Sequence, residues 1–368
     1  MIKVSFLSSK SNTAYLRGCD MPIQHSTYSI DSAGSRGSIT TTLLEAAADA
    51  VWRPYTCHQT FGGTAELIAE DGQQPGIHYG EALCCGTFGE LLQGQLPAGS
   101  LLGEPHFLVT MPIAVFARAH FMPIAGTRSV TVYPPHKLKA KRLAENLVIA
   151  LGVSGGSLLL QSELPEGKGL ASSSADLVAA ARSIACCFKR GVRTSLIEKL
   201  MAEIEPSDGV MYPGVVAYQQ RACRLLSFLG QMPPLAIVGI DEGGTIETLD
   251  YDQRRGEISA SHRAEYHQLL DRARIAIPRG DTATIGRIAT ASALLHQERV
   301  PKEHLNSMLK ASEATDALGV IVAHSGTMIG ILLDRMAADF PRKLRSVLAH
   351  VSQFDNSPKI YLTMTGCR

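Results

Sequence analysis

One segment of the chain, PEGKGLASSSAD at positions 165–176, constrains the possible folds more than any other. An apolar stretch with strand character at 157–163 runs into it, and apolar residues at helical spacing follow it. Gly167 and Gly169 allow backbone conformations and close approaches that other residues disfavour. The segment therefore predicts a strand, a glycine-rich turn and a helix in direct succession.

The turn in this segment is a candidate anion-binding site. Successive backbone N–H groups in a glycine-rich turn, with a helix N-terminus behind them, can bind phosphate. The hydroxyls of Ser172, Ser173 and Ser174 can contact a phosphate oxygen or ligate Mg²⁺, and Lys168 adds a positive charge beside the turn. The alternative is a serine that caps the helix without any ligand. The segment alone leaves both interpretations open.

The familiar nucleotide-binding motifs are absent from the sequence. It contains no GxxxxGK[ST] loop, no dinucleotide-binding GxGxxG after a first strand, and neither the HRD nor the DFG motif of protein kinases. An ATP site in this chain must therefore be of another type.

Composition and charge favour a globular enzyme with a small-molecule partner. The 368 residues correspond to two domains or one long domain. The 35 Lys and Arg residues balance 34 Asp and Glu residues, so the net charge of +1 gives no reason to expect nucleic acid or an anionic membrane as a partner. No apolar run approaches the ~18 residues of a membrane span. The apolar stretch at the start is too short for a signal peptide, and a cytoplasmic location is expected.

The eight cysteines form neither a metal site nor a disulfide framework. They occur as two adjacent pairs and four single residues, without CxxC spacing. We expect reduced and mostly buried thiols, as in a cytosolic protein.

The character of the chain changes near Gly80. Positions 1–79 are rich in Ser, Thr, Gly and Gln and are expected to form a poorly packed extension, with one helix at 42–51. From Gly80 onward, apolar periodicity predicts an α+β protein, and the turn cluster GQMPP at 230–234 marks a boundary. The predicted strands are 107–119 (interrupted by Pro112), 129–133, 157–163, 235–240 and 359–364. The predicted helices are 138–151, 194–204, 264–277, 281–297, 304–318 and 340–350.

Three segments together resemble the motifs of one enzyme family. PEGKGLASSSA resembles P-x-x-x-G-L-G-S-S-A-A, the central motif of the GHMP kinases (galactokinase and the homoserine, mevalonate and phosphomevalonate kinases), with Ala171 in place of one glycine. CCGTFGELLQG at 84–94 resembles the N-terminal motif, in which a Gly-Glu pair follows a strand. AHSGTMIGILL at 323–333 resembles the C-terminal glycine-rich motif, which packs against the phosphate loop. Three motifs in the family's order are much more specific than any one of them.

A narrower group within the family shares four segments with this chain. The L-threonine kinases of cobalamin side-chain synthesis and propanediol utilisation carry motifs similar to FGELLQG, KGLASSSAD, IEPSD and AHSGTMIG, which stand here at 88–94, 168–176, 204–208 and 323–330. Phe88 departs from the cysteine of that pattern, which leaves the exact substrate open.

The resemblance implies an α+β, two-lobed GHMP kinase fold. The N-terminal lobe at 80–232 would be ribosomal protein S5 domain 2-like, and the C-terminal lobe at 233–368 ferredoxin-like. The ATP site is expected between the lobes, with Mg²⁺ as the second cofactor. The residues that the resemblance places around ATP are Pro165, Gly167, Lys168, Gly169, Leu170, Ala171, Ser172, Ser173 and Ser174.

The resemblance also assigns roles to acidic residues of the IEPSD segment. Asp208 stands where the family has an aspartate near the substrate hydroxyl, and it would accept or orient the hydroxyl proton. Otherwise it is an Asp-Gly turn residue. Glu205 would ligate Mg²⁺ together with Ser173, in preference to Glu203.

Basic residues near the phosphate loop receive two interpretations. Lys168 would help to neutralise phosphate charge and is expected to act with Asp208 in catalysis. The run that contains Lys137, Lys139 and two further basic residues is expected on an exposed face, from which one residue could bind the substrate carboxylate.

The first and third motifs supply the expected substrate pocket. Glu90 would hold a substrate ammonium or hydroxyl, with Gln93 beside it. His324 would contact the substrate or, alternatively, form a buried hydrogen bond. Ser325 and Gly326 complete the set through backbone proximity rather than chemistry.

The expected function is that of an ATP- and Mg²⁺-dependent kinase that converts L-threonine to O-phospho-L-threonine for cobalamin side-chain synthesis. Two alternatives stay open at this stage. One is a GHMP kinase for another amino acid or amino alcohol, such as homoserine or serine. The other is a GHMP-fold regulator that binds ligand without catalysis. The expected partner is a small amino acid, not nucleic acid or membrane, and a homodimer is left open.

Overall fold

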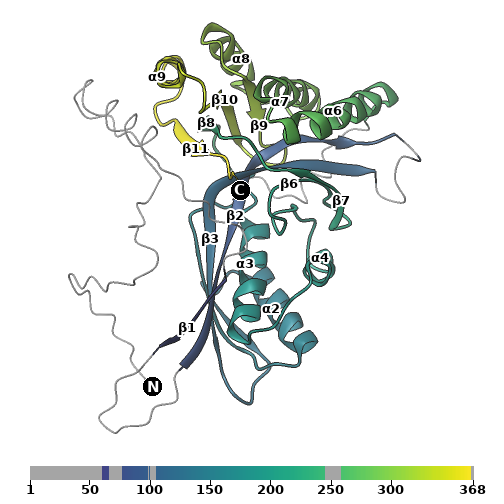
Figure 1. The fold of residues 1–368 in the computed structure, drawn as a ribbon, viewed down its shortest axis with the longest axis vertical. Helices are drawn as coiled ribbons and strands as arrows, with labels where there is room; N and C mark the ends of the chain where they lie inside the picture. Colours follow the sequence, from purple (N-terminus) through teal and green to yellow (C-terminus); the bar gives the residue numbers. More distant parts are fainter. Residues whose placement is uncertain (1–59, 66–76, 98, 100–104, 245–257, 366–368) are drawn as a thin grey trace, which may run out of the picture.

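Two long antiparallel strands, β2 (Ile77–Gln95) and β3 (His106–Pro123), connect the two lobes of the molecule (Figure 1). The computed structural model describes residues 60–65, 77–97, 99, 105–244 and 258–365. The first eight residues of β3 are all buried, whereas buried and partly exposed residues alternate along most of the remainder. The first part therefore lies between two layers of structure, and the remainder has one face toward solvent.

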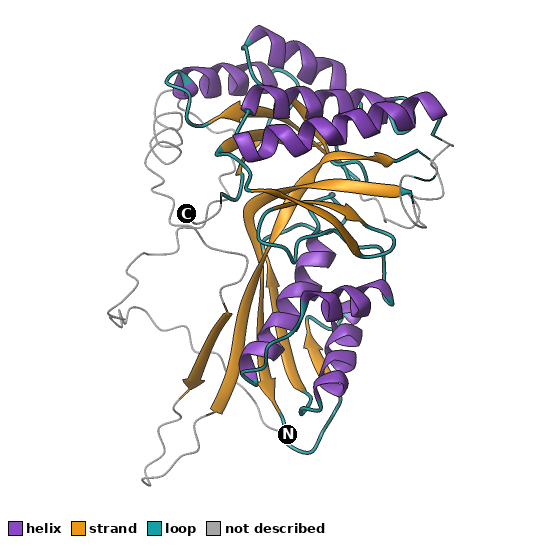
Figure 2. Ribbon diagram, turned by 45° about the vertical axis from the view of Figure 1, so that its right-hand side comes forward, coloured by secondary structure: helices purple, strands orange, loops and turns teal. Residues whose placement is uncertain are grey.

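A seven-stranded sheet forms the N-terminal lobe around β2 and β3. β1 (Thr60–Ala65) pairs with β2 at one edge, while β5 (Gly156–Ser162) and β4 (Val130–Tyr133) follow β3 at the other. β6 (Val215–Gln219) and β7 (Arg224–Gly230) extend the sheet from the first half of β3. Three helices lie beside this sheet, α2 (Leu138–Leu151), α3 (Ser172–Cys187) and α4 (Thr194–Ala202) (Figure 2).

The central helix of this lobe, α3, is buried along almost its whole length. Small residues make this burial possible, because its middle reads AAARS and lets the helix approach the strands closely. Gly80 of β2 marks the closest approach: a Cβ there would lie 2.0 Å from the carbonyl oxygen of Ser183. The helix that carries the serine-rich segment is therefore fixed rigidly against the sheet.

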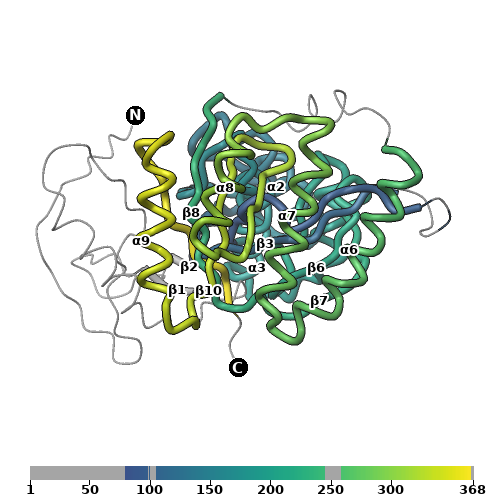
Figure 3. Tube along the Cα trace, turned by 90° about the horizontal axis from the view of Figure 1, so that it is seen from above, coloured from purple at the N-terminus to yellow at the C-terminus, as the bar shows by residue number. Residues whose placement is uncertain are grey.

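A four-stranded antiparallel sheet in the order β11-β8-β10-β9 forms the C-terminal lobe. Its strands are β8 (Leu235–Asp241), β9 (Gly319–Val322), β10 (Met328–Asp334) and β11 (Lys359–Leu362). Its helices are α6 (Ala260–Arg279), α7 (Thr282–Gln297), α8 (Leu305–Ala314) and α9 (Phe340–Val351). Figure 3 shows these helices following one another across the outer side of the lobe. The order strand, helices, two strands, helix, strand is the ferredoxin-like arrangement.

Two apolar cores result from the alternation of side chains along β8. Leu235 and Ile237 face the larger core, which continues into the N-terminal lobe, whereas Ala236, Val238 and Ile240 face a smaller core under α8 and α9. The larger core also holds residues of α6 and α7. The larger core therefore extends through both lobes, whereas the smaller core lies within the C-terminal lobe.

The two-lobed α+β fold expected from the resemblance is confirmed, with local differences in single elements. The long strand β2 was not among the predicted strands, and Pro112 does not interrupt β3. The strands β6 and β7 were not predicted, and α8 ends at Ala314 rather than near 318. The helix expected at 42–51 lies outside the described residues, and the division of the chain at 79/80 and 232/233 stays a prediction.

None of the described helices combines the length and the hydropathy that crossing a bilayer requires. Of the described cysteines, four are buried and Cys186 is half-buried.

Candidate active site

The loop before α3 adopts a backbone conformation suited to binding anions. Gly167, Gly169 and Ala171 have positive φ angles of 71°, 80° and 57°, and they alternate with residues of ordinary φ. Such alternation turns successive N–H groups toward one side, and here the N-terminus of α3 follows directly. Ala171 is the N-cap residue and no side chain caps the helix, so the interpretation of the serines as helix caps is wrong.

Two other motifs hold this phosphate loop in place (we use this name for residues 165–171). Its carbonyl oxygens accept backbone hydrogen bonds from both lobes. The three bonds run from Thr87 N–H to Leu170 O (3.2 Å), from Gly89 N–H to Gly169 O (3.0 Å) and from Thr327 N–H to Lys168 O (3.2 Å). Because three carbonyl groups of the loop accept these hydrogen bonds, the loop has a defined conformation without a ligand.

Glycines allow these three segments to meet. A Cβ at Gly326, in the turn between β9 and β10, would lie 2.2 Å from the carbonyl oxygen of Lys168. A Cβ at Gly169 would lie 2.5 Å from the Cβ of Ala323. Both distances are far below van der Waals contact, so this turn lies directly against the phosphate loop.

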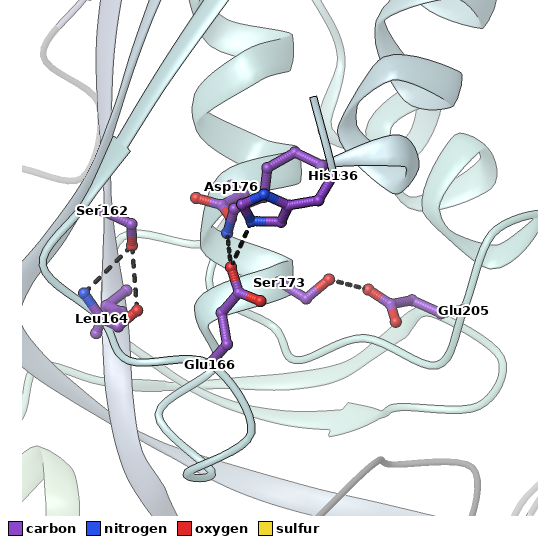
Figure 4. Close-up of polar contacts among 8 residues, drawn as sticks. His136, Ser162, Leu164, Glu166, Ser173, Asp176 and Glu205 are labelled. Carbon is purple, nitrogen blue, oxygen red and sulfur yellow. Dashed lines mark hydrogen bonds and ion pairs between the residues drawn. The ribbon is translucent and has the colours of Figure 1, made fainter. Parts of the chain in front are cut away.

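Ser173 and Glu205 lie together beside the loop, as the sequence predicted for a metal site. The Ser173 hydroxyl donates a hydrogen bond to one carboxylate oxygen of Glu205, and the Lys139 ammonium donates to the other oxygen (Figure 4 shows the serine and the glutamate). The Glu205 side chain is 10% exposed, whereas Glu203 is exposed to solvent. Mg²⁺ prefers hard oxygen ligands such as the hydroxyl and carboxylate oxygens of Ser173 and Glu205, and the carboxylate already binds the cationic Lys139 here.

The candidate donor set consists of two side chains, Ser173 and Glu205. Among the described residues, no group of three or more His, Cys, Asp or Glu side chains could hold a metal ion. Mg²⁺ usually takes only one or two protein oxygens and completes its octahedron with phosphate oxygens and water. Ser173 and Glu205 would supply those protein oxygens.

Asp208 lies in the loop after α4, beside Ser174 in the first turn of α3. Its backbone N–H donates to the Ser174 hydroxyl oxygen at 3.0 Å, and that hydroxyl lies 3.5 Å from the Asp208 carboxylate. Burial, followed by the negative charges of Glu90 and Glu205, raises the pKa of Asp208 to about 7. A carboxylate with this pKa can take up a proton near neutral pH.

Glu90 and His324 contact each other in the interior of the protein. Glu90 Oε2 accepts a hydrogen bond from the His324 backbone N–H at 3.0 Å and lies 3.0 Å from His324 Nδ1. The other ring nitrogen of His324 lies 2.9 Å from the Ser292 hydroxyl. All three side chains are buried. The geometry matches the alternative interpretation of His324, a buried histidine with hydrogen-bond partners.

The remaining predicted substrate residues differ in their surroundings. Gln93 is buried, and its Oε1 atom has no hydrogen-bond partner among the described residues. Ser325 is half-buried, and Gly326 is the close-contact residue described above. Gln93 thus retains a polar atom for a ligand; its role stays a prediction.

Lys137 is largely buried, so the prediction that it lies on an exposed face is wrong. Its side chain is 13% exposed, and its ammonium contacts Asp176 Oδ2 at 2.5 Å and Glu166 Oε1 at 2.6 Å. His136 also approaches Glu166, at 3.3 Å (Figure 4). Burial opposes the charge of Lys137, but the bonds and charges of its two carboxylate partners outweigh it and raise its pKa. Lys137 therefore ties α2 to the phosphate loop and to α3.

Lys168 extends from the phosphate loop to the C-terminal lobe. Its ammonium lies 2.8 Å from Asp241 Oδ2 and donates to the Gly244 carbonyl at 2.5 Å. Burial works against the Asp241 charge, but hydrogen bonds from Lys168 and Thr327 outweigh it and lower the pKa of Asp241. The ion pair between Lys168 and Asp241 was not predicted from the sequence. The role of Lys168 in neutralising phosphate charge stays a prediction.

The comparisons with known proteins point to one family. The family model described as the GHMP kinases N terminal domain matches residues 139–214. An L-threonine kinase of Salmonella typhimurium is 26% identical over 291 residues, which cover 76% of this chain and 91% of the relative. An L-threonine kinase of Citrobacter freundii is 26% identical over 261 residues, which cover 70% of this chain and 88% of the relative.

Solved structures agree on the fold. A homoserine kinase from Cytophaga hutchinsonii superposes with a TM-score of 0.61 at 14% identity, covering 82% of this chain and 98% of its own. An L. major mevalonate kinase in complex with R-mevalonate superposes with a TM-score of 0.59 at 13% identity, covering 86% and 99%. The matched residues 139–214 contain the phosphate loop, Ser173, Glu205 and Asp208. The chain therefore carries a GHMP kinase N-terminal domain, and over most of its length it is similar to small-molecule kinases of this type.

Proposed function

We propose that this kinase transfers the γ-phosphoryl group of ATP to the side-chain hydroxyl of L-threonine, which gives O-phospho-L-threonine and ADP. The observation that carries the proposal is the similarity to two L-threonine kinases over 91% and 88% of their lengths. The four motif segments on this chain all lie around the phosphate loop or at its contacts. Such similarity includes the parts of the chain that would select the acceptor, not only the ATP-binding helix.

The phosphate loop and the first turn of α3 would bind the triphosphate of ATP. The N–H groups made available by the left-handed residues Gly167, Gly169 and Ala171 would face its oxygens. Ser173 and Glu205 would hold Mg²⁺, which neutralises charge on the β- and γ-phosphates when it is bound. Lys139, which contacts Glu205 in this structure, lies where it could turn to a phosphate oxygen.

Asp208 would act on the acceptor. As the threonine hydroxyl oxygen attacks the γ-phosphorus, the bond from that phosphorus to the β–γ bridging oxygen breaks and ADP leaves. The hydroxyl proton passes to the Asp208 carboxylate, or the carboxylate orients the hydroxyl and water takes the proton. A carboxylate whose pKa is about 7 suits either role at neutral pH.

Purified protein incubated with ATP, Mg²⁺ and single amino acids tests the proposal. Mass spectrometry should detect phosphothreonine and, in parallel samples, much less phosphohomoserine or phosphoserine. Turnover of homoserine or serine with no phosphothreonine would reject L-threonine as the substrate and leave the GHMP kinase assignment intact. The role in cobalamin side-chain synthesis, the cytoplasmic location and the oligomeric state stay predictions.

Ser173→Ala is expected to weaken the use of Mg·ATP more than it weakens folding. The substitution removes the oxygen that would share Mg²⁺ with Glu205, while the N-cap of α3 at Ala171 is untouched. The KM for Mg·ATP should rise about tenfold with a small change in Tm. The matched control is Ser195→Ala, on the exposed side of α4. An unchanged KM would show that Ser173 has no role in metal binding.

Glu90→Gln is expected to shift the pH dependence of the reaction. The Glu90 charge raises the pKa of Asp208, so its removal should lower that pKa. Glutamine can still accept the hydrogen bond from the His324 backbone. The acid limb of the kcat/KM profile should therefore move to lower pH, while the exposed control Glu203→Gln leaves it in place. An acid limb that stays at the wild-type pH contradicts this coupling.

A further inference from the structure

A buried lysine in the C-terminal lobe has no role in the site described so far. Lys302 lies in the connection between α7 and α8, and it is only 4% exposed. A lysine is almost never buried to this extent without a partner. Its ammonium donates a hydrogen bond to the carbonyl of Gly326. A charged group thus lies beneath the turn that supports the phosphate loop.

The backbone of Lys302 is held firmly. Gln297, the last residue of α7, accepts a hydrogen bond from the Lys302 N–H at 2.7 Å and donates one to the Lys302 carbonyl at 3.1 Å. The N–H of Leu305 contacts the same carbonyl at 3.4 Å. Both ends of one amide side chain therefore fix the point from which the lysine extends toward Gly326.

Carboxylates around Lys302 counteract the cost of burying its charge. Burial lowers the pKa of Lys302, and the negative charges of Glu242, Glu90 and Asp241 act in the opposite direction. Asp241 also accepts hydrogen bonds from Lys168 of the phosphate loop and from Thr327 of the turn. Lys302 is thus part of a charged cluster that connects β8, the turn and the phosphate loop.

The backbone at Gly326 packs so closely against the phosphate loop that the positions of the two segments are coupled. A Cβ at Gly326 would lie 2.2 Å from the Lys168 carbonyl oxygen and 2.4 Å from the Gly169 Cα. The next residue, Thr327, donates its backbone N–H to that same Lys168 carbonyl. No space separates the two backbones, so a displacement of the turn must displace the loop.

We propose that Lys302 is a positioning residue for the nucleotide. By holding the Gly326 carbonyl, it sets the distance of the phosphate loop from the C-terminal lobe, and with it the direction of the loop N–H groups. Lys302 acts through Gly326 and does not touch the nucleotide. The proposal rests on the kinase assignment but not on the identity of the acceptor.

Lys302→Met tests this role, because methionine keeps the length and apolar stem of lysine and removes the ammonium. The Kd of a fluorescent ATP analogue, measured without acceptor, should rise about tenfold or more, as expected when a charge-assisted hydrogen bond is lost. The KM for ATP should rise with it, and the KM for the acceptor should stay unchanged. The control Lys310→Met, at an exposed position on α8, should bind the analogue like the wild type.

Two results would overturn the proposal. One is a folded Lys302→Met protein with an unchanged Kd for the analogue, which would reduce the lysine to a stabilising role. The other is an equal rise in both KM values, which would mean a general disturbance of the site. Because the binding measurement needs no acceptor, it stays decisive even if threonine is not the substrate.

A second variant carries the test if Lys302→Met fails to fold. Gln297→Met leaves the Lys302 ammonium and the Gly326 carbonyl in place and frees only the lysine backbone. It should raise the Kd for the analogue in the same direction and by a smaller factor. Wild-type affinity in this variant would contradict a positioning role.

Discussion

Asp208→Asn should lower kcat by about 10²–10⁴-fold, the usual contribution of a general base, while the Kd for ATP stays unchanged. Asparagine keeps the shape and the backbone contact to Ser174 but cannot accept the hydroxyl proton. Steady-state kinetics and nucleotide binding on the same preparation measure both quantities. Asp271→Asn, on the exposed face of α6, is the matched control and should retain full activity.

The pH profile of the wild-type kinase separates the two roles left open for Asp208. Only the ionised carboxylate accepts a proton, and its pKa is about 7, so kcat/KM should fall as the pH is lowered through 7. The Asp208→Asn protein should lack this limb. An identical limb in both proteins would assign it to another group, and a kcat close to that of the wild type would mean that Asp208 is only a turn residue.

The same substitution should stabilise the protein at alkaline pH. The folded-state pKa of Asp208 lies above the value of 3.8 for an unperturbed aspartate, so the folded state binds this proton more tightly than the unfolded state. The resulting stability is present at low pH and is lost as the pH rises through about 7. At pH 8 the Tm of Asp208→Asn should therefore exceed that of the wild type, and near pH 4 the difference should disappear.

Gly326→Ala should strongly impair the use of ATP. The added carbon would lie 2.2 Å from the Lys168 carbonyl oxygen and 2.4 Å from the Gly169 Cα, and both neighbours are backbone atoms that cannot rotate away. The phosphate loop must shift to accommodate it. A displacement of about 1 Å in a catalytic site can cost ~10²-fold, so kcat/KM for ATP should fall by about that factor.

The control for this substitution is Gly191→Ala. No atom lies within 4 Å of a Cβ at Gly191, and its φ angle is not in the left-handed region, so the alanine is tolerated without rearrangement. Wild-type kinetics in Gly326→Ala would show that the turn and the loop are separable, which contradicts the close contact described above. Circular dichroism on both proteins excludes global unfolding as the cause of any loss.

Helices were predicted from the sequence more reliably than strands, for reasons visible in particular residues. The helix predicted at 138–151 agrees with α2 because Leu143, Leu147 and Ala140 form one buried stripe. The strand β2, which contains four glycines, was not predicted. In the structure these glycines serve close packing: a Cβ at Gly94 would lie 2.5 Å from the ring of Tyr266. Glycine marks close approach as well as chain reversal, and sequence alone does not distinguish the two.

The proline in β3 shows a second limit of local patterns. Proline breaks a regular ladder because it has no N–H. Pro112 lies opposite Thr87, next to a register shift between β2 and β3, and its carbonyl accepts a hydrogen bond from Met364 N–H at 2.9 Å. The irregular pairing and the contact from a distant segment make the residue compatible with the strand.

The candidate site could be predicted as far as its residues lie within recognisable motifs. Ser173 and Glu205 are 32 positions apart, and the motif pattern alone connected them before the structure placed their side chains in contact. Lys137 and Asp176 could not be connected in this way, because their ion pair depends on how α2 packs against α3. Lys302 carries no local signal of its position, since a lysine between two helices is usually exposed.

The shared apolar interior has a consequence for how the enzyme can be divided. Tyr266 of α6, Ile285 of α7 and Tyr361 of β11 lie in the same core as Phe88 of β2, and the rings of Phe88 and Tyr361 meet edge to face at 5.1 Å. Cutting the chain between the two sheets would expose this surface on both pieces. We therefore expect that neither half can be exchanged for that of a relative unless the residues across the boundary change with it, and that the two lobes unfold together.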